Sequence, residues 1–344
     1  MTILIAGIMM LFGCTLGGSS STTGGVMKSV DAGKTFESRV TIDEKNSLAR
    51  TNVLSMAIDP VNNSTVYIGT DRSGVYVSMD GALSWKQIDV GLSDITNVAI
   101  SPINTQRIYV SGMYNGRGSV ILTDDGGVNW RRVYVEPEDG TNITSMITSL
   151  TNGNIVYIGT SGGTIARTGN GGESWENLYH ANSIINDLLI DASDLNTLYA
   201  LVSNDDIVRT RDGGTTFESI GDLKRVRDVE GVYDGNLFSI AVSPAVSGVI
   251  FVGTDQGVFR SADYGLSWTS VDVIASTIGI PIHAIKVSPH DPNQLVYAAA
   301  KAVYTSVPGG WAITDTTSER VVDVIRHDPI DPNVVYIGLR KAAN

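Results

Sequence analysis

The stretch RSADYGLSW, residues 260–268, decides the fold because variants of it recur along the chain. The other copies are KSVDAGKTF (28–36), VSMDGALSW (77–85), LTDDGGVNW (122–130), RTGNGGESW (167–175) and RTRDGGTTF (209–217). Their shared template is S/T-x-D-x-G-x-S/T-W/F, and its third position is occupied by Asp31, Asp80, Asp125, Asn170, Asp212 and Asp263. A seventh copy, YTSVPGGW (304–311), keeps Gly-Gly-Trp but lacks the acidic residue. Regular recurrence with a period of roughly 40–50 residues predicts a repeat architecture.

Every copy after the first follows two short apolar runs separated by a polar turn. In one repeat these runs are ITNVAISP (95–102) and RIYVSG (107–112). A third run enters the template and a fourth leaves from its aromatic residue. Short β-branched and aromatic runs bounded by turn residues, with no helical period, indicate strands. Four strands in a unit of this length form one blade, so the sequence predicts an all-β, seven-bladed β-propeller.

The two ends of the chain complement each other. The last two runs, within 321–339, have no template after them, and the first template, 28–36, has no inner pair before it. We therefore expect N-terminal outer strands to pair with C-terminal inner strands in a shared seventh blade, which closes the ring. Residues 26–344 are predicted to be a single propeller domain.

The N-terminus has the features of a lipoprotein signal. Residues 2–12, TILIAGIMMLF, form an uncharged apolar run that is too short to span a bilayer. The run ends in LFGC, which resembles a bacterial lipobox. Residues 1–13 are thus predicted to be a signal peptide, Cys14 the lipidated residue and residues 14–25 a flexible tether. This places the propeller in a bacterial cell envelope, anchored on the extracytoplasmic side of a membrane; an inert, buried Cys14 is the alternative.

Composition excludes several classes of function. The formal net charge is −12 and no run of basic residues exists, so nucleic acid is not an expected partner. The four histidines lack metal-site spacing, and no phosphate-binding glycine motif occurs. We expect a monomer without metal or cofactor.

The template predicts a structural role for its own residues. Its Ser/Thr and Asp side chains can bond the backbone of their turn, its glycine tolerates a positive φ, and its Trp or Phe can pack on a neighbouring blade. The template resembles the Asp-box, or BNR repeat, of sialidases, sortilin-type receptor propellers, xyloglucanase-like glycosidases and photosystem II assembly factors. That resemblance implies that the box is structural and lies away from the ligand face.

Binding residues are expected instead in the loops between blades and between second and third strands. Candidates for partner contact are Arg72, Tyr114, Arg117, Lys224, Arg225, Arg227 and Arg340, with Asp205, Asp206 and Asp255 on the same rim. The basic cluster 224–227 lies in the longest insertion, which makes it the leading candidate for a partner contact. For each of these residues, a solvated loop charge is the alternative.

The predicted function is a membrane-tethered, non-catalytic binding or assembly module for a protein or glycan. The photosystem II assembly factors are the nearest functional analogy. The alternative is a sugar-binding protein or a glycoside hydrolase of the sialidase or xyloglucanase type. Asp71 and Asp255, which follow strands at equivalent points of two repeats, are weak catalytic candidates, and turn chemistry explains their recurrence equally.

Overall fold

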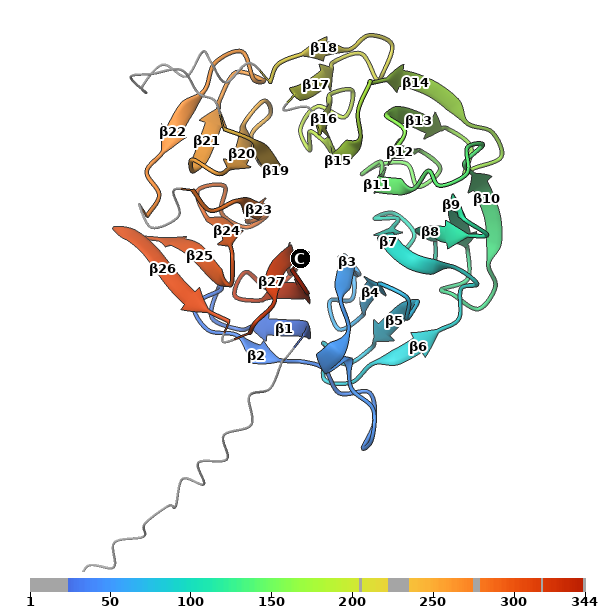
Figure 1. Cartoon of the computed structure of the whole chain (residues 1–344), viewed down its shortest axis with the longest axis horizontal. Helices are drawn as coiled ribbons and strands as arrows, with labels where there is room; N and C mark the ends of the chain where they lie inside the picture. The colour runs from blue at the N-terminus through green and yellow to red at the C-terminus, as the bar shows by residue number, and fades with distance from the viewer. Residues whose placement is uncertain (1–23, 204–205, 222–234, 275–278, 317, 343–344) are drawn as a thin grey trace, which may run out of the picture.

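The computed structural model describes residues 24–203, 206–221, 235–274, 279–316 and 318–342. Within these ranges the chain forms seven four-stranded antiparallel sheets arranged around a central channel (Figure 1). The one helical element described is a 3-10 turn, η1 (Leu48–Arg50). The prediction of an all-β, seven-bladed propeller is confirmed.

The blades are numbered in chain order, with each strand order running from the channel outward. Blade 1 contains β3 (Val53–Ile58), β4 (Val66–Thr70), β5 (Val75–Ser78) and β6 (Lys86–Ile88). Blade 2 contains β7 (Ser93–Ile100), β8 (Ile108–Tyr114), β9 (Arg117–Thr123) and β10 (Arg131–Val135). Blade 3 contains β11 (Ile143–Thr148), β12 (Val156–Thr160), β13 (Thr164–Thr168) and β14 (Glu176–His180).

The second half of the ring repeats this pattern. Blade 4 contains β15 (Ile185–Ile190), β16 (Leu198–Val202), β17 (Asp206–Thr210) and β18 (Glu218–Ser219). Blade 5 contains β19 (Leu237–Val242), β20 (Ile250–Thr254), β21 (Val258–Ser261) and β22 (Thr269–Val271). Blade 6 contains β23 (Ile282–Val287), β24 (Leu295–Ala299), β25 (Ala302–Val307) and β26 (Gly310–Asp315).

Blade 7 joins the two ends of the chain, as predicted. Its order from the channel is β27 (Val321–His327), β28 (Val335–Arg340), β1 (Gly25–Ser29) and β2 (Glu37–Ser38). β1 pairs with β28 in five register positions, from Gly25 opposite Leu339 to Ser29 opposite Val335. Across the next junction, the Arg320 guanidinium bonds the backbone carbonyls of Arg50 and Thr51. The ring is therefore closed by backbone pairing and tied to blade 1 by a charged side chain.

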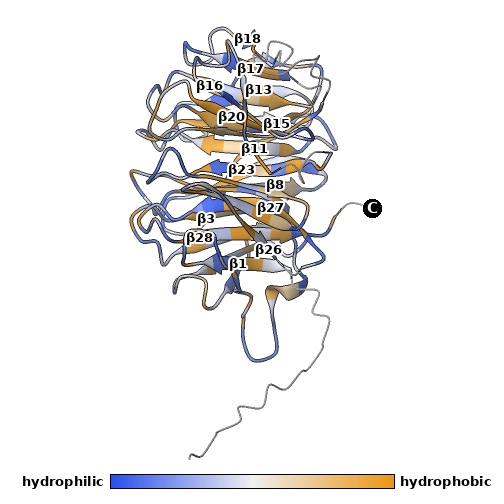
Figure 2. Ribbon diagram, turned by 90° about the vertical axis from the view of Figure 1, so that its left-hand side faces the viewer, coloured by the Kyte–Doolittle hydropathy of each residue, from blue (hydrophilic) through white to orange (hydrophobic). Residues whose placement is uncertain are grey.

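The apolar core lies between the blades. One cluster joins Tyr67 and Val75 of blade 1 to Val98 and Val110 of blade 2, and comparable clusters occur around the ring. Figure 2 shows the ring edge-on, with apolar strands in its interior and polar loops at both faces. We call the face that carries the loops between blades and the second-to-third strand loops the mouth face. The opposite face, with the first-to-second strand turns and the repeated boxes, is the Asp-box face.

Each Asp-box side chain is occupied by hydrogen bonds inside its own turn. In the copy at 261–268, Asp263 accepts the Ser261 hydroxyl at 2.8 Å, the Ser267 amide at 2.9 Å and the Ser267 hydroxyl at 2.6 Å. The Ser261 hydroxyl in turn accepts the amide of Gly265 at 2.7 Å. Asn170 holds an equivalent network through its amide oxygen and nitrogen. The box therefore closes the hairpin between the third and fourth strands.

These bonds favour the ionised carboxylate. The Asn129 amide, followed by the Thr123 hydroxyl, lowers the pKa of Asp125 to about 2. Because the folded pKa lies below the ordinary value, the turn contributes stability above about pH 4 that is lost as the pH falls toward 2.

Three tryptophans, Trp85, Trp175 and Trp311, donate hydrogen bonds to the preceding blade, whereas Trp130 donates to Gly127 of its own box. Trp85 donates its indole N–H to the Arg39 carbonyl at 2.9 Å, and Trp175 donates to the Val133 carbonyl at 2.9 Å, each on the preceding blade. In blade 6 the decayed copy has become a tight hairpin, with Val307 opposite Gly310. Its Trp311 keeps the bond to the preceding blade, through the Asp272 carbonyl at 2.9 Å.

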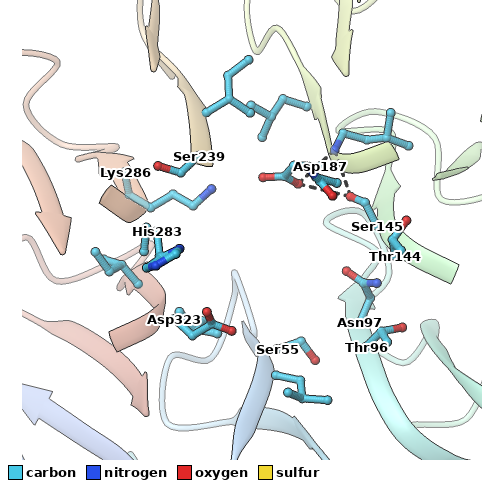
Figure 3. A pocket seen from close by; sticks show the side chains of 18 of the residues that line it. Ser55, Thr96, Asn97, Thr144, Ser145, Asp187, Ser239, His283, Lys286 and Asp323 are labelled. Carbon is cyan, nitrogen blue, oxygen red and sulfur yellow. Dashed lines mark hydrogen bonds between the residues drawn. The ribbon is translucent and has the colours of Figure 1, made fainter. Parts of the chain in front are cut away.

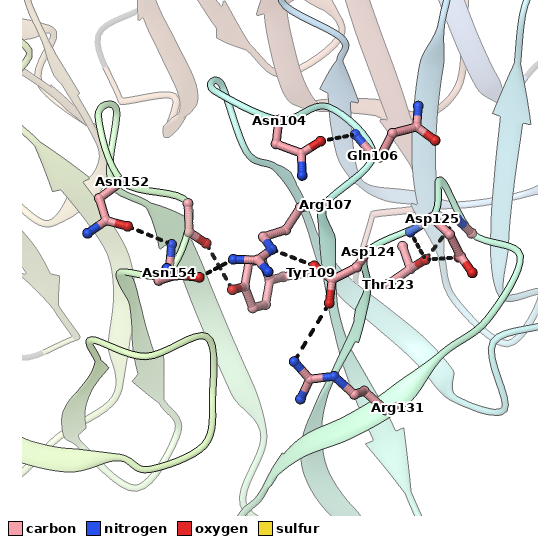
Figure 4. A network of polar contacts seen from close by, with 12 residues as sticks. Asn104, Gln106, Arg107, Tyr109, Thr123, Asp124, Asp125, Arg131, Asn152 and Asn154 are labelled. Atoms are coloured by element: carbon pink, nitrogen blue, oxygen red, sulfur yellow. Dashed lines mark hydrogen bonds and ion pairs between the residues drawn. The ribbon is translucent and has the colours of Figure 1, made fainter.

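A second set of turns, on the same face, also links blades. Figure 4 shows Arg107 of blade 2 between Asp124 of its own box and Asn154 of blade 3. The Tyr109 hydroxyl reaches across the same junction to the Gly153 carbonyl at 2.9 Å. These polar contacts fix the angle between adjacent blades.

The glycine of the VYIGT motif is explained by the approach of the next blade. A Cβ on Gly69 would lie 2.5 Å from Cγ2 and 2.7 Å from the carbonyl oxygen of Ile95, the buried residue that begins the core of blade 2. It would also lie 2.4 Å from the Ser55 hydroxyl. Gly253 is equally close to Ile282 of the following blade. The glycine leaves space for the next inner strand.

We predict that Asp263→Ala lowers the free energy of unfolding by about 1–2 kcal/mol, because several turn hydrogen bonds are lost. Asp263→Asn should lose less, since the network around Asn170 shows that an amide can hold the same turn. Denaturant unfolding measures both values. Equal losses for the two variants would contradict the hydrogen-bond account of the box.

Gly69→Ala should destabilise the chain by about 1–3 kcal/mol, because the added methyl overlaps the Ile95 backbone. Gly169→Ala is the matched control: a Cβ there meets nothing within 4 Å, so the change should stay below about 0.5 kcal/mol. Thermal and denaturant unfolding of both variants test this difference. Indistinguishable stabilities would show that Gly69 is not needed for blade packing.

Candidate binding site in the central channel

Polar side chains of the inner strands point into the channel because each inner strand contains a β-bulge or similar register shift. In blade 1, Val53 pairs with Thr70 but Ser55 pairs with Gly69, so Leu54 is an extra residue. The register shifts near the start of the inner strand in every blade. A bulge bends a strand and redirects its side chains. Here it brings consecutive residues of each inner strand toward the channel.

These residues enclose a cavity of about 260 Å³. Toward the mouth face it is lined mainly by hydroxyl and amide side chains. They are Ser55, Thr96, Asn97, Thr144, Ser145, Asn186 and Ser239. The charged and titratable side chains that line it are Asp187, His283, Lys286, Asp323 and Arg326. Figure 3 shows most of these side chains converging on the channel from different blades.

Several of these hydroxyl groups make hydrogen bonds across the junction between adjacent blades. The Thr144 hydroxyl bonds the Ile185 carbonyl of blade 4, and the Ser239 hydroxyl bonds the Ile282 carbonyl of blade 6 at 2.6 Å. The Ser145 hydroxyl accepts the Leu188 amide of blade 4 at 2.9 Å. This part of the polar ring is accounted for by packing of the blades.

Lys286 is different, because nothing in the described structure pairs with it. Its ammonium group makes no hydrogen bond or ion pair with a described residue. The equivalent inner-strand positions of five other blades hold Ala57, Ala99, Ile147, Leu189 and Ala241. Burial lowers the pKa of Lys286 to about 8, with Asp187 opposing and Arg326 adding to the shift. Blade 7 holds Arg326 at this position, so cations stand in two adjacent blades where the other five have an aliphatic side chain.

Arg326 is the other cation at this level of the channel, and it is held by backbone. Its Nε donates to the Met56 carbonyl of blade 1 at 2.9 Å, and one terminal nitrogen donates to the Ile325 carbonyl at 2.9 Å. Burial lowers its pKa. Arg326 therefore joins blade 7 to blade 1 while adding positive charge beside Lys286.

Two carboxylates face these cations. Asp187 enters from the opposite wall and accepts the Leu188 amide at 2.9 Å and the Ser145 hydroxyl at 3.2 Å (Figure 3). Asp323, at the mouth, is paired with both Arg340 nitrogens at 2.9 and 2.8 Å. Because Arg340 neutralises Asp323, the charges around the cavity leave one positive charge in excess, in a chain whose formal net charge is −12.

The rim candidates fall mainly on three consecutive blades of the mouth face. Arg72 of blade 1 is exposed, Arg340 of blade 7 pairs with Asp323, and Arg117 of blade 2 pairs with Asp139. The Arg132 guanidinium lies 3.4 Å from the centre of the Tyr114 ring. The structure thus brings these basic and aromatic side chains to one side of the mouth.

Other predicted residues lie elsewhere or cannot be placed. Asp206, on blade 4, accepts the Ser219 hydroxyl at 2.6 Å. Asp205 and the predicted contact cluster of Lys224, Arg225 and Arg227 lie outside the described residues, as does Cys14.

Asp71 and Asp255 make equivalent turn contacts. The Asn52 side-chain amide donates to Asp71 at 2.7 Å, and the Asn236 side-chain amide donates to Asp255 at 3.1 Å. Each bond ties the loop entering a blade to the loop after that blade's second strand. The two carboxylates serve separate blades, and each has a local structural partner.

The Asp-box face carries most of the exposed apolar side chains of the described chain. Five lie in first-to-second strand turns: Val61, Ile103, Leu150, Val246 and Ile330. Five lie in the boxes: Val30, Met79, Leu83, Val128 and Leu266. This face is therefore more apolar at its loop tips than the mouth face, where Ile184 is one exposed example.

No group of three or more potential metal ligands occurs among the described residues. His290 donates its Nε2–H to the Asp328 carbonyl, 2.9 Å away. Burial, reinforced by His290 and Lys286, lowers the pKa of His327 to about 4. In the same described portion, no helix has the length and apolar character needed to cross a bilayer.

Sequence reasoning directed attention to the loops and missed the channel. Lys286, Asp187 and Arg326 lie inside the inner strands β23, β15 and β27, not in loops. Aligning the seven inner strands would have revealed Lys286 and Arg326, because they share a column in which the other five blades hold Ala, Ile or Leu. These side chains meet only because the ring closes, and the positions of the residues in the sequence do not show that they meet.

Fold and repeat together identify the chain as a seven-bladed β-propeller built from Asp-box, or BNR, repeats. Residues 45–188 match the family model described as photosynthesis system II assembly factor YCF48. No curated protein sequence matches the chain.

Solved structures show the same fold at low sequence identity. YCF48 from Cyanidioschyzon merolae is 15% identical with a TM-score of 0.64, covering 84% of this chain and 95% of its own. A structure of YCF48 bound to D1 peptide is 15% identical with a TM-score of 0.64, and the match covers 85% of this chain and 94% of that one. The GH74 xyloglucanase from Xanthomonas campestris gives 15% identity and a TM-score of 0.68 over 84% of this chain. The match spans about half, 51%, of that xyloglucanase chain.

We predict that Lys286→Leu raises the free energy of unfolding by about 1 kcal/mol, because an unpaired cation leaves a half-buried position. Leu189 occupies the equivalent position of blade 4, so the strand accommodates this side chain. Lys86→Leu, on an exposed outer strand, controls for the change in net charge. Destabilisation by Lys286→Leu alone would show that Lys286 supports the fold.

Proposed function

We propose that this chain is a non-catalytic binding module that holds a protein partner on its mouth face. The observation that carries the proposal is the group of basic and aromatic side chains on one side of that face, Arg72, Tyr114, Arg117 and Arg340. Arg72 is exposed there. The Asp-box side chains, in contrast, form hydrogen bonds within their own turns.

The carboxylates argue against glycoside hydrolysis. That reaction needs two carboxyl groups flanking one bond, with one of them able to donate a proton. Both oxygens of Asp323 accept hydrogen bonds from Arg340, so this carboxylate is already committed to an ion pair. Asp71 and Asp255 stand on blades 1 and 5 and each bonds a loop amide. The described carboxylates thus support binding better than catalysis.

The comparisons support a protein partner. The family-model match and two solved neighbours concern YCF48, and one of these neighbours is bound to a D1 peptide. At 15% identity they support the fold, and the peptide belongs to that protein. By analogy we propose a peptide segment or protein surface as the partner here. A glycan is the alternative, favoured by the GH74 likeness.

We further propose that the propeller is tethered to a bacterial envelope membrane through Cys14. The proposal rests on the order of apolar run, cysteine and Gly/Ser/Thr-rich segment in residues 2–25. The first described residue, Gly24, donates to the Ala49 carbonyl at the mouth face. A tether entering there would keep the proposed binding face toward the membrane.

Charge reversal should separate the two faces. Arg72→Glu combined with Arg117→Glu should weaken capture of the partner at least tenfold in a pull-down from native membranes, read by quantitative mass spectrometry. Lys34→Glu, in the box of blade 7, is the control on the opposite face and should leave capture unchanged. Loss with Lys34→Glu alone would move the site to the Asp-box face. If no protein is captured and the chain binds xyloglucan, the glycan alternative replaces the proposal.

Cys14→Ser should release the protein from the membrane fraction, because the thiol that would carry the lipid is removed. Fractionation and immunoblotting of cells that express the wild type and the variant measure this. Retention of the variant in the membrane fraction would contradict the lipid anchor while leaving the propeller assignment intact.

A further inference from the structure

We propose that the channel holds a binding site for a small hydroxylated carboxylate, such as a sugar acid, with Lys286 as its anion-binding group. This site lies inside the ring and is independent of the protein-binding function proposed for the face. Three features of the cavity support it: its unpaired cation, its polar wall and its size.

The cation is the first feature. A charge taken from water is normally compensated by a partner, and Lys286 has none among the described residues. Asp187 faces it across the channel without forming an ion pair with it. The space between these two side chains suits a ligand that accepts from the ammonium and donates a hydroxyl to the carboxylate.

The surrounding charge favours an anion. Arg326 lies beside Lys286 and is committed to backbone carbonyls, and Asp323 is neutralised by Arg340. The cavity therefore keeps one excess positive charge although the chain is acidic overall. At short range in a partly enclosed site, this local charge outweighs the distant surface charges.

The wall supplies hydrogen bonds for hydroxyl groups. Asn97 uses its amide nitrogen on the Ser111 hydroxyl, which leaves its oxygen for a ligand. Asn186 uses its oxygen on the Ser203 hydroxyl, which leaves its amide nitrogen. Asp187 has one oxygen without a described bond. A cavity of about 260 Å³ is slightly smaller than a typical drug-sized pocket, which suits a monosaccharide-sized ligand.

The repeat shows that the lysine is not needed to build the strand. Five blades place Ala, Ile or Leu at its position, and the sixth, blade 7, places Arg326, which is held by the Met56 and Ile325 carbonyls. Unlike Arg326, Lys286 gains no described partner, and a cation that faces a cavity without a partner is better explained by a ligand than by the fold.

Isothermal titration calorimetry of the full chain tests the proposal with D-glucuronate as probe and D-glucose as its neutral analogue. Glucuronate should bind at least tenfold more tightly than glucose at pH 7. Lys286→Leu should weaken glucuronate binding at least tenfold, and Lys86→Leu should leave it unchanged. Unfolding curves establish that each variant is folded.

The pH dependence gives a second readout. Glucuronate affinity should fall about tenfold or more between pH 7 and 9.5, as the ammonium loses its proton while the ligand stays ionised. The other charged groups around the ammonium are Asp187, Asp323, Arg326 and Arg340, and burial lowers the pKa of His283 and of His327, so both histidines are already neutral at pH 7. The neutral analogue should show no such fall.

Three results would overturn the proposal. They are equal affinities for glucuronate and glucose, undiminished binding by the folded Lys286→Leu variant, and equal affinity for inorganic phosphate. The last would indicate an adventitious ion only. None of these results would affect the pull-down that tests the face, so the two proposals fail separately.

Discussion

The pairing of β1 with β28 is the contact on which the rest of the structure depends. It joins residues more than three hundred positions apart in sequence and turns seven sheets into a closed ring. Without it, the inner strands of blades 7 and 1 would not meet, and Arg326 could not reach the Met56 carbonyl. The channel exists because the ring is closed, so the candidate site is a product of this one backbone ladder.

Within the ring, repetition separates structural residues from residues free to serve another purpose. The box hydrogen bonds recur around the ring, and their carboxylates have no oxygen to spare for a ligand. The glycines of the second strands, such as Gly69 and Gly253, recur where the inner strand of the next blade packs most closely. Lys286 stands at an inner-strand position that holds Ala, Ile or Leu in five blades, and it has no described partner. A charged side chain that differs from most of its repeat and has no oppositely charged partner is the feature that indicates a binding site.

The sequence was sufficient for the architecture because each repeat carries its own local instructions. Turn residues, strand lengths and the complementary ends specify seven blades and their seam, and all three agree with the structure. The candidate site was less accessible. Asp187 and Lys286 are 99 residues apart, and neither belongs to a motif. Only the bulges and the closed ring direct them toward the same space, and those are properties of the tertiary structure.

The central claim is that the mouth face, and not the more apolar Asp-box face, meets the partner. The most direct test places a photo-crosslinking amino acid at Arg72 in one variant and at Val128, which is 78% exposed on the opposite face, in another. Both proteins are irradiated in native membranes. The account predicts a crosslinked partner from position 72 and none from position 128. A product from position 128 alone would contradict it and assign binding to the Asp-box face.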